Sequence, residues 1–208
     1  MVAPLLLLGL VMPLSATRPT ILLTVVDDLG FGDVGFRSSR VGTGDIVTPT
    51  IDALAASGVV LGKYYVHPIC SPTRTALLSG RYSYTVGAAG GVITNGRPNA
   101  LPLNVSTLAD HLRAAGWRCM AAGKWDLGMH AWSFTPTFRG FERFVGFYDA
   151  AEDHFTHEAG RALDLRNDTA PLRTEAGVYS TNLYASAVVN FIREHAPSPT
   201  RAGGEASE

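Results

Sequence analysis

One cysteine stands in a short motif whose neighbours could make it a reactive group. Cys70 is followed by Ser-Pro-Thr and then Arg74, and the pattern predicts a helix over 72–79 that ends at Gly80. The N–H groups and the dipole at a helix start favour anions, and a guanidinium adds a forked donor for a tetrahedral oxyanion. A buried structural cysteine is the commoner fate of a lone Cys. The proline, the arginine and the helix start together favour a reactive position instead.

Two adjacent carboxylates, Asp27 and Asp28, follow the apolar run 21–26. Neighbouring carboxylates repel each other when both are ionised, so a bound cation is favoured there. Their hard oxygen atoms suit Ca²⁺ or Mg²⁺. Asp-Asp-Leu-Gly is also good turn chemistry, and from this pair alone a turn or helix cap is the favoured interpretation.

A third candidate, Gly-Lys-Trp-Asp at 123–126, closes the predicted strand 118–122. Lys124 could reach the same cleft as a second cation, although a solvated surface lysine is the usual case. Open α/β sheets carry their sites at the carboxyl ends of strands, where all three motifs are predicted to lie.

The elements that must position these residues alternate between strand and helix. Continuous apolar runs predict buried strands, and helices are marked by capping residues, apolar faces and a following Gly or Pro. This alternation predicts an α/β fold with a mainly parallel sheet, and a loop-rich segment over 126–178. A helix at the end of the pattern should feed another strand, and none follows, so we expect a truncated sheet and chain. The predicted strands are 21–26, 59–66 and 118–122, and the other predicted helices are 49–57, 107–115 and 180–195.

Composition predicts a globular, secreted protein. The 208 residues are 46% apolar and 17% charged with a net charge of −1, and no basic stripe indicates nucleic acid as a partner. An apolar run over 5–12 and the following Pro-Leu-Ser-Ala predict a signal peptide over 1–16, with a buried strand as the alternative. That run is too short to span a bilayer. We expect one domain over 20–196 and a disordered tail over 197–208.

Two sequons support secretion, because Asn104 and Asn167 each begin an Asn-x-Ser/Thr acceptor for glycosylation. The chain has two cysteines, Cys70 and Cys119, which a secreted protein could pair. The motif around Cys70 gives that residue a better explanation than a disulfide.

The motifs resemble those of a known family. Cys-Ser-Pro-Thr-Arg at 70–74, continued by Leu-Leu-Ser-Gly-Arg-Tyr at 77–82, resembles the sulfatase signature. Asp27-Asp28-Leu-Gly resembles the family's first metal-binding segment, and Gly-Lys-Trp at 123–125 resembles its lysine motif. The resemblance runs from about residue 20 to 195, and its later parts look most like the arylsulfatase B subgroup. It implies the fold of the alkaline phosphatase superfamily.

This resemblance also implies a mechanism. A formylglycine-generating enzyme would oxidise Cys70 to formylglycine, whose hydrated aldehyde attacks sulfur with one hydroxyl and releases sulfate with the other. Asp27, Asp28 and residue 70 would hold Ca²⁺, with Mg²⁺ as the alternative, while Arg74 and Lys124 would stabilise the transition state. The implied substrate is an aryl sulfate or a sulfated sugar, and the implied location is lysosomal or extracellular.

Two departures from the family pattern leave other interpretations open. Asp126 stands where the family has a histidine that contacts the formylglycine hydroxyl, which predicts slower release of sulfate. The family's remaining metal ligands, second histidine and second lysine come later than this sequence extends. The chain is therefore interpreted as a sulfatase, as a secreted non-catalytic fragment that binds metal or sulfated glycans, or as a related phosphoester hydrolase.

Overall fold

The computed structural model describes residues 18–38, 42, 44, 46–88, 90–93 and 97–195. The chain divides into two compact units, residues 1–49 and residues 50–208. The predicted signal peptide over 1–16 and the predicted tail over 197–208 lie outside the described residues.

The first unit contains a turn and one short helix. Asp28 adopts a left-handed backbone with φ of 56°. Directly after it, the Gly30 N–H donates to Asp33 Oδ2 at 2.8 Å. Helix α1 (Gly35–Ser38) follows, and the Gly35 N–H donates to Thr48 Oγ1 at 2.8 Å. The turn predicted as the simpler interpretation of Asp27-Asp28 is therefore present.

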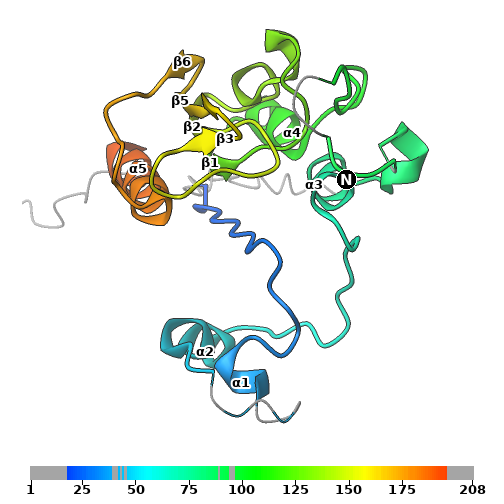
Figure 1. Cartoon of the computed structure of the whole chain (residues 1–208). Coiled ribbons are helices and arrows are strands. Elements are labelled where there is room, and N and C mark those ends of the chain that lie inside the picture. Colours follow the sequence, from blue (N-terminus) through cyan, green and yellow to red (C-terminus); the bar gives the residue numbers. More distant parts are fainter. Residues whose placement is uncertain are drawn as a thin grey trace, which may run out of the picture. The chain divides into compact units, whose positions relative to one another are not determined.

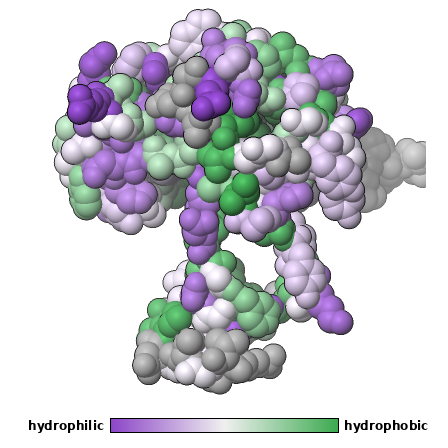
Figure 2. All heavy atoms as spheres, turned by 45° about the vertical axis from the view of Figure 1, so that its right-hand side comes forward, coloured by the Kyte–Doolittle hydropathy of each residue, from purple (hydrophilic) through white to green (hydrophobic). Residues whose placement is uncertain are grey.

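Two of the three predicted strands are not formed. Residues 21–26 and 59–66 have no strand structure, and their large apolar side chains are exposed, from Val25 at 44% to Val59 at 90%. A β-strand exists only when its backbone groups bond to a neighbour, and neither run is paired among the described residues. Apolar side chains at the surface are visible as green atoms on the face drawn in Figure 2. Both runs are apolar, but the prediction that they form strands was wrong.

The predicted helices of the second unit are confirmed. Helix α4 has a complete capping box, in which Thr107 Oγ1 accepts from the Asp110 N–H and the Asp110 carboxylate accepts from the Thr107 N–H. Two short 3₁₀ turns, η2 and η3, fill part of the segment predicted to be loop-rich. The helical elements are α2 (Pro49–Ser57), α3 (Cys70–Ser79), η1 (Ser83–Val86), α4 (Leu108–Ala114), η2 (Trp132–Phe134), η3 (Pro136–Phe138) and α5 (Ser180–His195).

A four-stranded mixed sheet forms the centre of this unit, in the order β1-β2-β5-β6 (Figure 1). Strands β1 and β2 are parallel, whereas the β2–β5 and β5–β6 pairs are antiparallel. The α/β class is as predicted, and the described sheet is mixed rather than mainly parallel. The strands are β1 (Met120–Lys124), β2 (Arg143–Phe147), β5 (Leu165–Asn167) and β6 (Ala170–Pro171), with β3 (Glu158–Ala159) and β4 (Ala162–Leu163) in a separate hairpin.

Two glycines set the spacing of the parallel pair, because Gly123 of β1 lies opposite Gly146 of β2. A Cβ placed on Gly146 would lie 2.0 Å from the Gly123 carbonyl oxygen, and Gly123 itself has φ of 93°. Both positions therefore require glycine. The adjoining core consists of Leu101, Val105, Trp125, Leu127, Phe144 and Tyr148.

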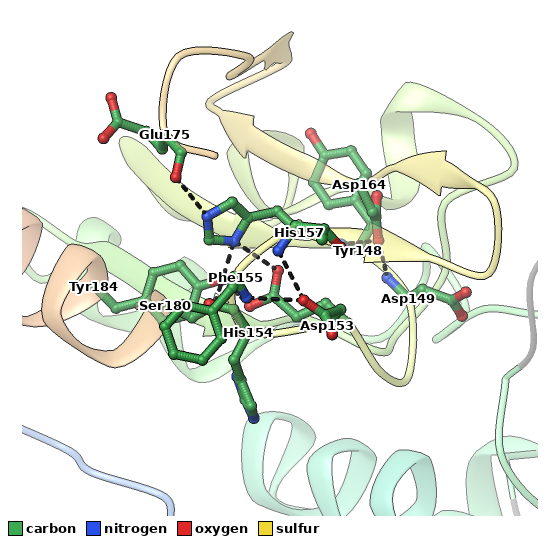
Figure 3. Close-up of polar contacts among 12 residues, drawn as sticks. Tyr148, Asp149, Asp153, His154, Phe155, His157, Asp164, Glu175, Ser180 and Tyr184 are labelled. Atoms are coloured by element: carbon green, nitrogen blue, oxygen red, sulfur yellow. Dashed lines mark hydrogen bonds and ion pairs between the residues drawn. The ribbon is translucent and has the colours of Figure 1, made fainter. Parts of the chain in front are cut away.

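Helix α5 packs against β1 and β2 and is held by a buried polar cluster (Figures 1 and 3). In this cluster, which we call the α5 anchor, the Tyr184 hydroxyl donates to Glu152 and His157 Nδ1 lies 3.7 Å from the other Glu152 oxygen. His157 also lies 3.3 Å from the Ser180 hydroxyl and 2.9 Å from the Glu175 carbonyl oxygen. The α5 anchor thus comprises Glu152, His157, Glu175, Ser180 and Tyr184.

The loop that carries His157 is fixed by its own backbone. Asp153 Oδ1 accepts from the N–H groups of Phe155 and Thr156, and the His157 N–H donates to the Asp153 carbonyl. The Ser180 N–H donates to the His154 carbonyl, which ties the start of α5 to this loop. The Asp153 and His157 side chains are therefore satisfied within the fold.

Candidate active site

The cysteine motif forms the first turn of α3. Ile69 is extended, with φ of −138° and ψ of 161°, and the helix begins at Cys70 rather than at the predicted Pro72. Thr73 fixes this turn, because its hydroxyl donates to the carbonyls of His67 and Ile69. Cys70 is half-buried at the helix start, where backbone N–H groups have no intrahelical partner. The cysteine is therefore in the helical turn that favours anions.

The lysine motif follows the carboxyl end of β1, as predicted. The ladder with the β2 segment continues past the strand, since the Trp125 N–H donates to the Phe147 carbonyl and the Asp126 N–H to the Tyr148 carbonyl. Asp126 then turns the chain with φ of 55°. The indole of Trp125 donates to the carbonyl of Gly128, which closes the turn from inside the core.

Hydrogen bonds join these two motifs. The Arg74 guanidinium donates from Nη1 to the Lys124 carbonyl at 2.6 Å, and the Ser71 hydroxyl donates to Asp126 Oδ1 at 2.8 Å. A third segment enters through the Ile93 N–H, which donates to Ser71 Oγ at 2.7 Å. We call these five residues the α3–β1 junction.

The junction contains two cations and one buried carboxylate. The Lys124 ammonium lies 3.9 Å from Asp126 Oδ2, and their side chains are 8% and 0% exposed. Burial raises the pKa of Asp126, while the hydrogen bond from Ser71 and the charges of Lys124 and Arg74 act to lower it. Oδ2 is buried and has no hydrogen-bond donor among the described residues.

The structure therefore brings together the segments that carry four predicted site residues, namely Cys70 and Arg74 on α3 with Lys124 at the end of β1 and Asp126 after it. Asp27 and Asp28 belong to the first unit, where both are exposed.

Cys70 and Cys119 are not joined by a disulfide, in agreement with the interpretation of the Cys70 motif. The remaining cysteine is buried, and burial raises the pKa of the Cys119 thiol. A raised thiol pKa gives less of the reactive thiolate, so Cys119 is a structural residue.

Sequence reasoning missed the roles of Ser71 and Ile93. Ser71 lies between the cysteine and the proline and could have been noticed as a small polar residue in a helical first turn. Its partner, Asp126, is 55 residues away, and nothing in the spacing indicates the bond. Ile93 contributes only its backbone, so its side chain carries no signal.

Comparison with known proteins identifies the family. The sulfatase family model matches residues 19–200, which is most of the chain. The chain belongs to the sulfatase family.

Curated relatives agree with this assignment. The chain is 37% identical to arylsulfatase J of Mus musculus over 190 residues, which cover 88% of this chain and 31% of that protein. It is 37% identical to arylsulfatase A of Homo sapiens over 163 residues, which cover 77% of this chain and 30% of that protein. The chain thus spans about three tenths of the length of these relatives.

Solved structures support the fold. The crystal structure of Ps i-CgsB has a TM-score of 0.71 and 29% sequence identity, covering 81% of this chain and 40% of its own. The PsFucS1 sulfatase from Pseudoalteromonas sp. has a TM-score of 0.65 at 22% identity, covering 82% of this chain and 39% of its own. These neighbours confirm the predicted alkaline phosphatase-like fold.

Proposed function

We propose that the protein hydrolyses sulfate esters, with residue 70 as the nucleophile after oxidation of Cys70 to formylglycine. The observation that carries this proposal is the hydrogen bond from Arg74 to the Lys124 carbonyl, which unites the cysteine and lysine motifs. Membership of the sulfatase family favours sulfate-ester hydrolysis as the reaction at such a site. Formylglycine would supply a hydrated aldehyde, with one hydroxyl to attack sulfur and a second to let sulfate leave.

The residues around Cys70 suit a doubly charged tetrahedral group. Arg74 and Lys124 carry positive charge at the start of α3, whose dipole adds to their field. Because the Lys124 side chain is almost fully buried, its interaction with an anion would be weakly screened by solvent. Charge that develops on the sulfate oxygens would therefore be stabilised by groups already in place.

A divalent metal is also proposed, with Asp27, Asp28 and residue 70 as ligands. The two exposed carboxylates offer hard oxygen atoms, which fit Ca²⁺ and, as the alternative, Mg²⁺. A thiol is a soft ligand that hard cations avoid, so oxidation of Cys70 would also make this donor set consist of oxygen alone. The fit can be checked without turnover, because Ca²⁺ should raise the melting temperature of the chain and a D27N/D28N variant should lose that increase.

The proposed substrate is an aryl sulfate or a sulfated sugar, and the proposed partner during synthesis is a formylglycine-generating enzyme. The curated relatives are arylsulfatases. One solved neighbour, Ps i-CgsB, was crystallised with k-i-k-neocarrahexaose. These two findings support an aryl and a carbohydrate substrate, respectively.

A secretory route, to the lysosome or out of the cell, is proposed with glycosylation at Asn104 and Asn167. Both asparagines are exposed, and Asn167 lies at the end of β5 beside the turn to β6. Digestion of the secreted chain with a peptide N-glycosidase should lower its mass at both sites. Among the described residues, no helix is long and apolar enough to cross a membrane.

One observation favours a second candidate, a non-catalytic member of the family that binds metal or sulfated glycans. The buried Asp126 carboxylate lies close to the Lys124 ammonium and partly cancels its charge. Such a site would attract an anion less strongly than two cations alone. Binding of a sulfated glycan without hydrolysis would support this candidate.

The test is to secrete the chain from cells that contain the formylglycine-generating enzyme. Mass analysis of the peptide around Cys70 would show an aldehyde in place of the thiol, and 4-nitrophenyl sulfate would be hydrolysed in preference to 4-nitrophenyl phosphate. Faster hydrolysis of the phosphate would favour a phosphoester hydrolase. An aldehyde without turnover of either ester would favour the non-catalytic candidate.

A further inference from the structure

The Asp126 carboxylate is engaged by the residue next to Cys70. Ser71 is fully buried, and its hydroxyl lies 2.8 Å from Asp126 Oδ1. The same hydroxyl oxygen lies 2.7 Å from the Ile93 backbone nitrogen. A backbone N–H can only donate, so the oxygen of Ser71 accepts from Ile93 and its single proton points to Asp126. With the Asp126 carboxylate ionised, both hydrogen bonds therefore have a fixed direction.

Asp126 is held from its other side by the sheet. Its own N–H donates to the Tyr148 carbonyl at 3.1 Å, directly after β1. The residue is 1% exposed, so a charge-assisted hydrogen bond there is weakly screened. Through Ser71, Asp126 thus connects the rigid end of the sheet to the first turn of α3.

The second carboxylate oxygen faces Lys124. Oδ2 lies 3.9 Å from the Lys124 ammonium and accepts no hydrogen bond among the described residues. The Asp126 carboxylate therefore contacts two neighbours. Oδ1 accepts from Ser71, on the helix that carries Cys70, and Oδ2 lies beside the Lys124 ammonium.

We propose that Asp126 is a positioning residue, which fixes residue 70 through Ser71 and moderates the charge of Lys124. This inference rests on the proposed function, and it assigns Asp126 a role different from that of the family's histidine, which contacts the reacting group itself. In this role the carboxylate acts on the geometry of the nucleophile and on the affinity for sulfate.

Three substitutions separate these effects. Asp126→Asn keeps an oxygen acceptor for Ser71 and removes the charge, and Asp126→Ala removes both. Ser71→Ala removes the donor to Asp126 together with the acceptor of the Ile93 N–H. With 4-nitrophenyl sulfate, Asp126→Ala and Ser71→Ala should each lower kcat about tenfold, and the double variant should be no worse than either. Asp126→Asn should keep kcat within about twofold of the wild type and lower KM, because the charge of Asp126 no longer offsets that of Lys124.

The opposite pattern would overturn the inference. Direct action on the reacting group predicts that Asp126→Asn loses as much kcat as Asp126→Ala, while Ser71→Ala changes little. A purely structural role predicts lower melting temperatures with unchanged kcat per folded, modified molecule.

A second measurement does not depend on turnover. Hydrogen exchange of the backbone amides in the first turn of α3, including Thr73, should be about tenfold faster in Ser71→Ala and Asp126→Ala but unchanged in Asp126→Asn. Ser79→Ala, which removes a hydroxyl at the other end of this helix, is the matched control. If exchange follows this order and no ester is hydrolysed, the positioning role stands and the proposed function fails. Unchanged exchange in Ser71→Ala would sink the positioning role whatever the turnover.

Discussion

The α5 anchor and the α3–β1 junction are both buried polar clusters of the second unit, but their chemistry differs. In the anchor, a Glu152 carboxylate with no exposed surface is matched by the Tyr184 hydroxyl and by His157. In the junction, two basic side chains, Arg74 and Lys124, face one carboxylate, Asp126. In each cluster one buried carboxylate oxygen, Glu152 Oε2 or Asp126 Oδ2, accepts no hydrogen bond among the described residues. The anchor thus sets one carboxylate beside one histidine, whereas the junction keeps an excess of positive charge, which is typical of a site that receives an anion.

This comparison predicts that substitutions in the junction will affect turnover and substitutions in the anchor will affect stability. The largest effect is expected for Cys70→Ala, which removes the proposed nucleophile and should lower kcat/KM by more than about a thousandfold. The melting temperature should change little, since Cys70 is only half-buried. Cys119→Ala, at the buried cysteine, is the control and should keep turnover per folded molecule. Retained hydrolysis in Cys70→Ala would exclude residue 70 as the nucleophile.

Lys124→Ala should have the next largest effect. Loss of a buried cation that stabilises the transition state typically costs about a hundredfold in turnover. The chain has one other lysine, the exposed Lys63, and Lys63→Ala is therefore the matched control for loss of the same side chain. Equal kcat/KM values for the two variants would show that Lys124 has no role in the reaction.

His157→Ala should destabilise the anchor without changing the reaction at the junction. Removing His157 leaves Glu152 with the Tyr184 hydroxyl as its remaining partner in the anchor, so the free energy of unfolding should fall by about 3 kcal/mol, measured by urea denaturation. Turnover per folded molecule should stay at the wild-type level. His111→Ala, at an exposed position in the last turn of α4, should change stability little. A large loss of kcat in folded His157→Ala would erase the distinction between the two clusters.

Asp164 offers a smaller, pH-dependent effect near the anchor. Its Oδ2 accepts from the N–H groups of Tyr148 and Asp149, and burial raises its pKa overall. A raised folded-state pKa means that folding favours the protonated form. Its contribution to stability is therefore complete below about pH 4, the ordinary aspartate pKa, and is lost as the pH rises through the raised value.

Asp164→Asn should reduce this decline, because the amide does not ionise, while Asp126, whose pKa is also raised, would keep part of it. Denaturation of both proteins between pH 4 and pH 7 would test the sign, and parallel curves would contradict it.

Local signals were enough to predict the α-helices of the second unit, because each carries its own boundary residues, whereas the short α1 was not predicted. Thr107 with Asp110 marks α4, and glycine in a left-handed conformation marks the end of α3 at Gly80. The strands could not be predicted in the same way, because a strand forms only with a pairing partner that the sequence does not identify. The apolar run 21–26 does not pair within the described residues, whereas β2 (Arg143–Phe147) pairs on both sides and was missed inside a segment rich in turns.

The candidate site divides in the same way. Cys70, Arg74 and Lys124 could be predicted because their motifs are short and lie beside element ends. The bond between Ser71 and Asp126 could not be predicted, since it depends on how α3 and β1 pack.

The facing pair Gly123 and Gly146 carries one more consequence. The separation of β1 and β2 is set there by hydrogen atoms alone, so the smallest possible enlargement, a methyl group at residue 146, would push against a peptide carbonyl with no side chain to yield. Because Lys124, Trp125 and Asp126 follow directly from Gly123, that push would be transmitted along the backbone to all three. The geometry of the candidate site could thus be lost through an added carbon atom at a position with no chemistry of its own.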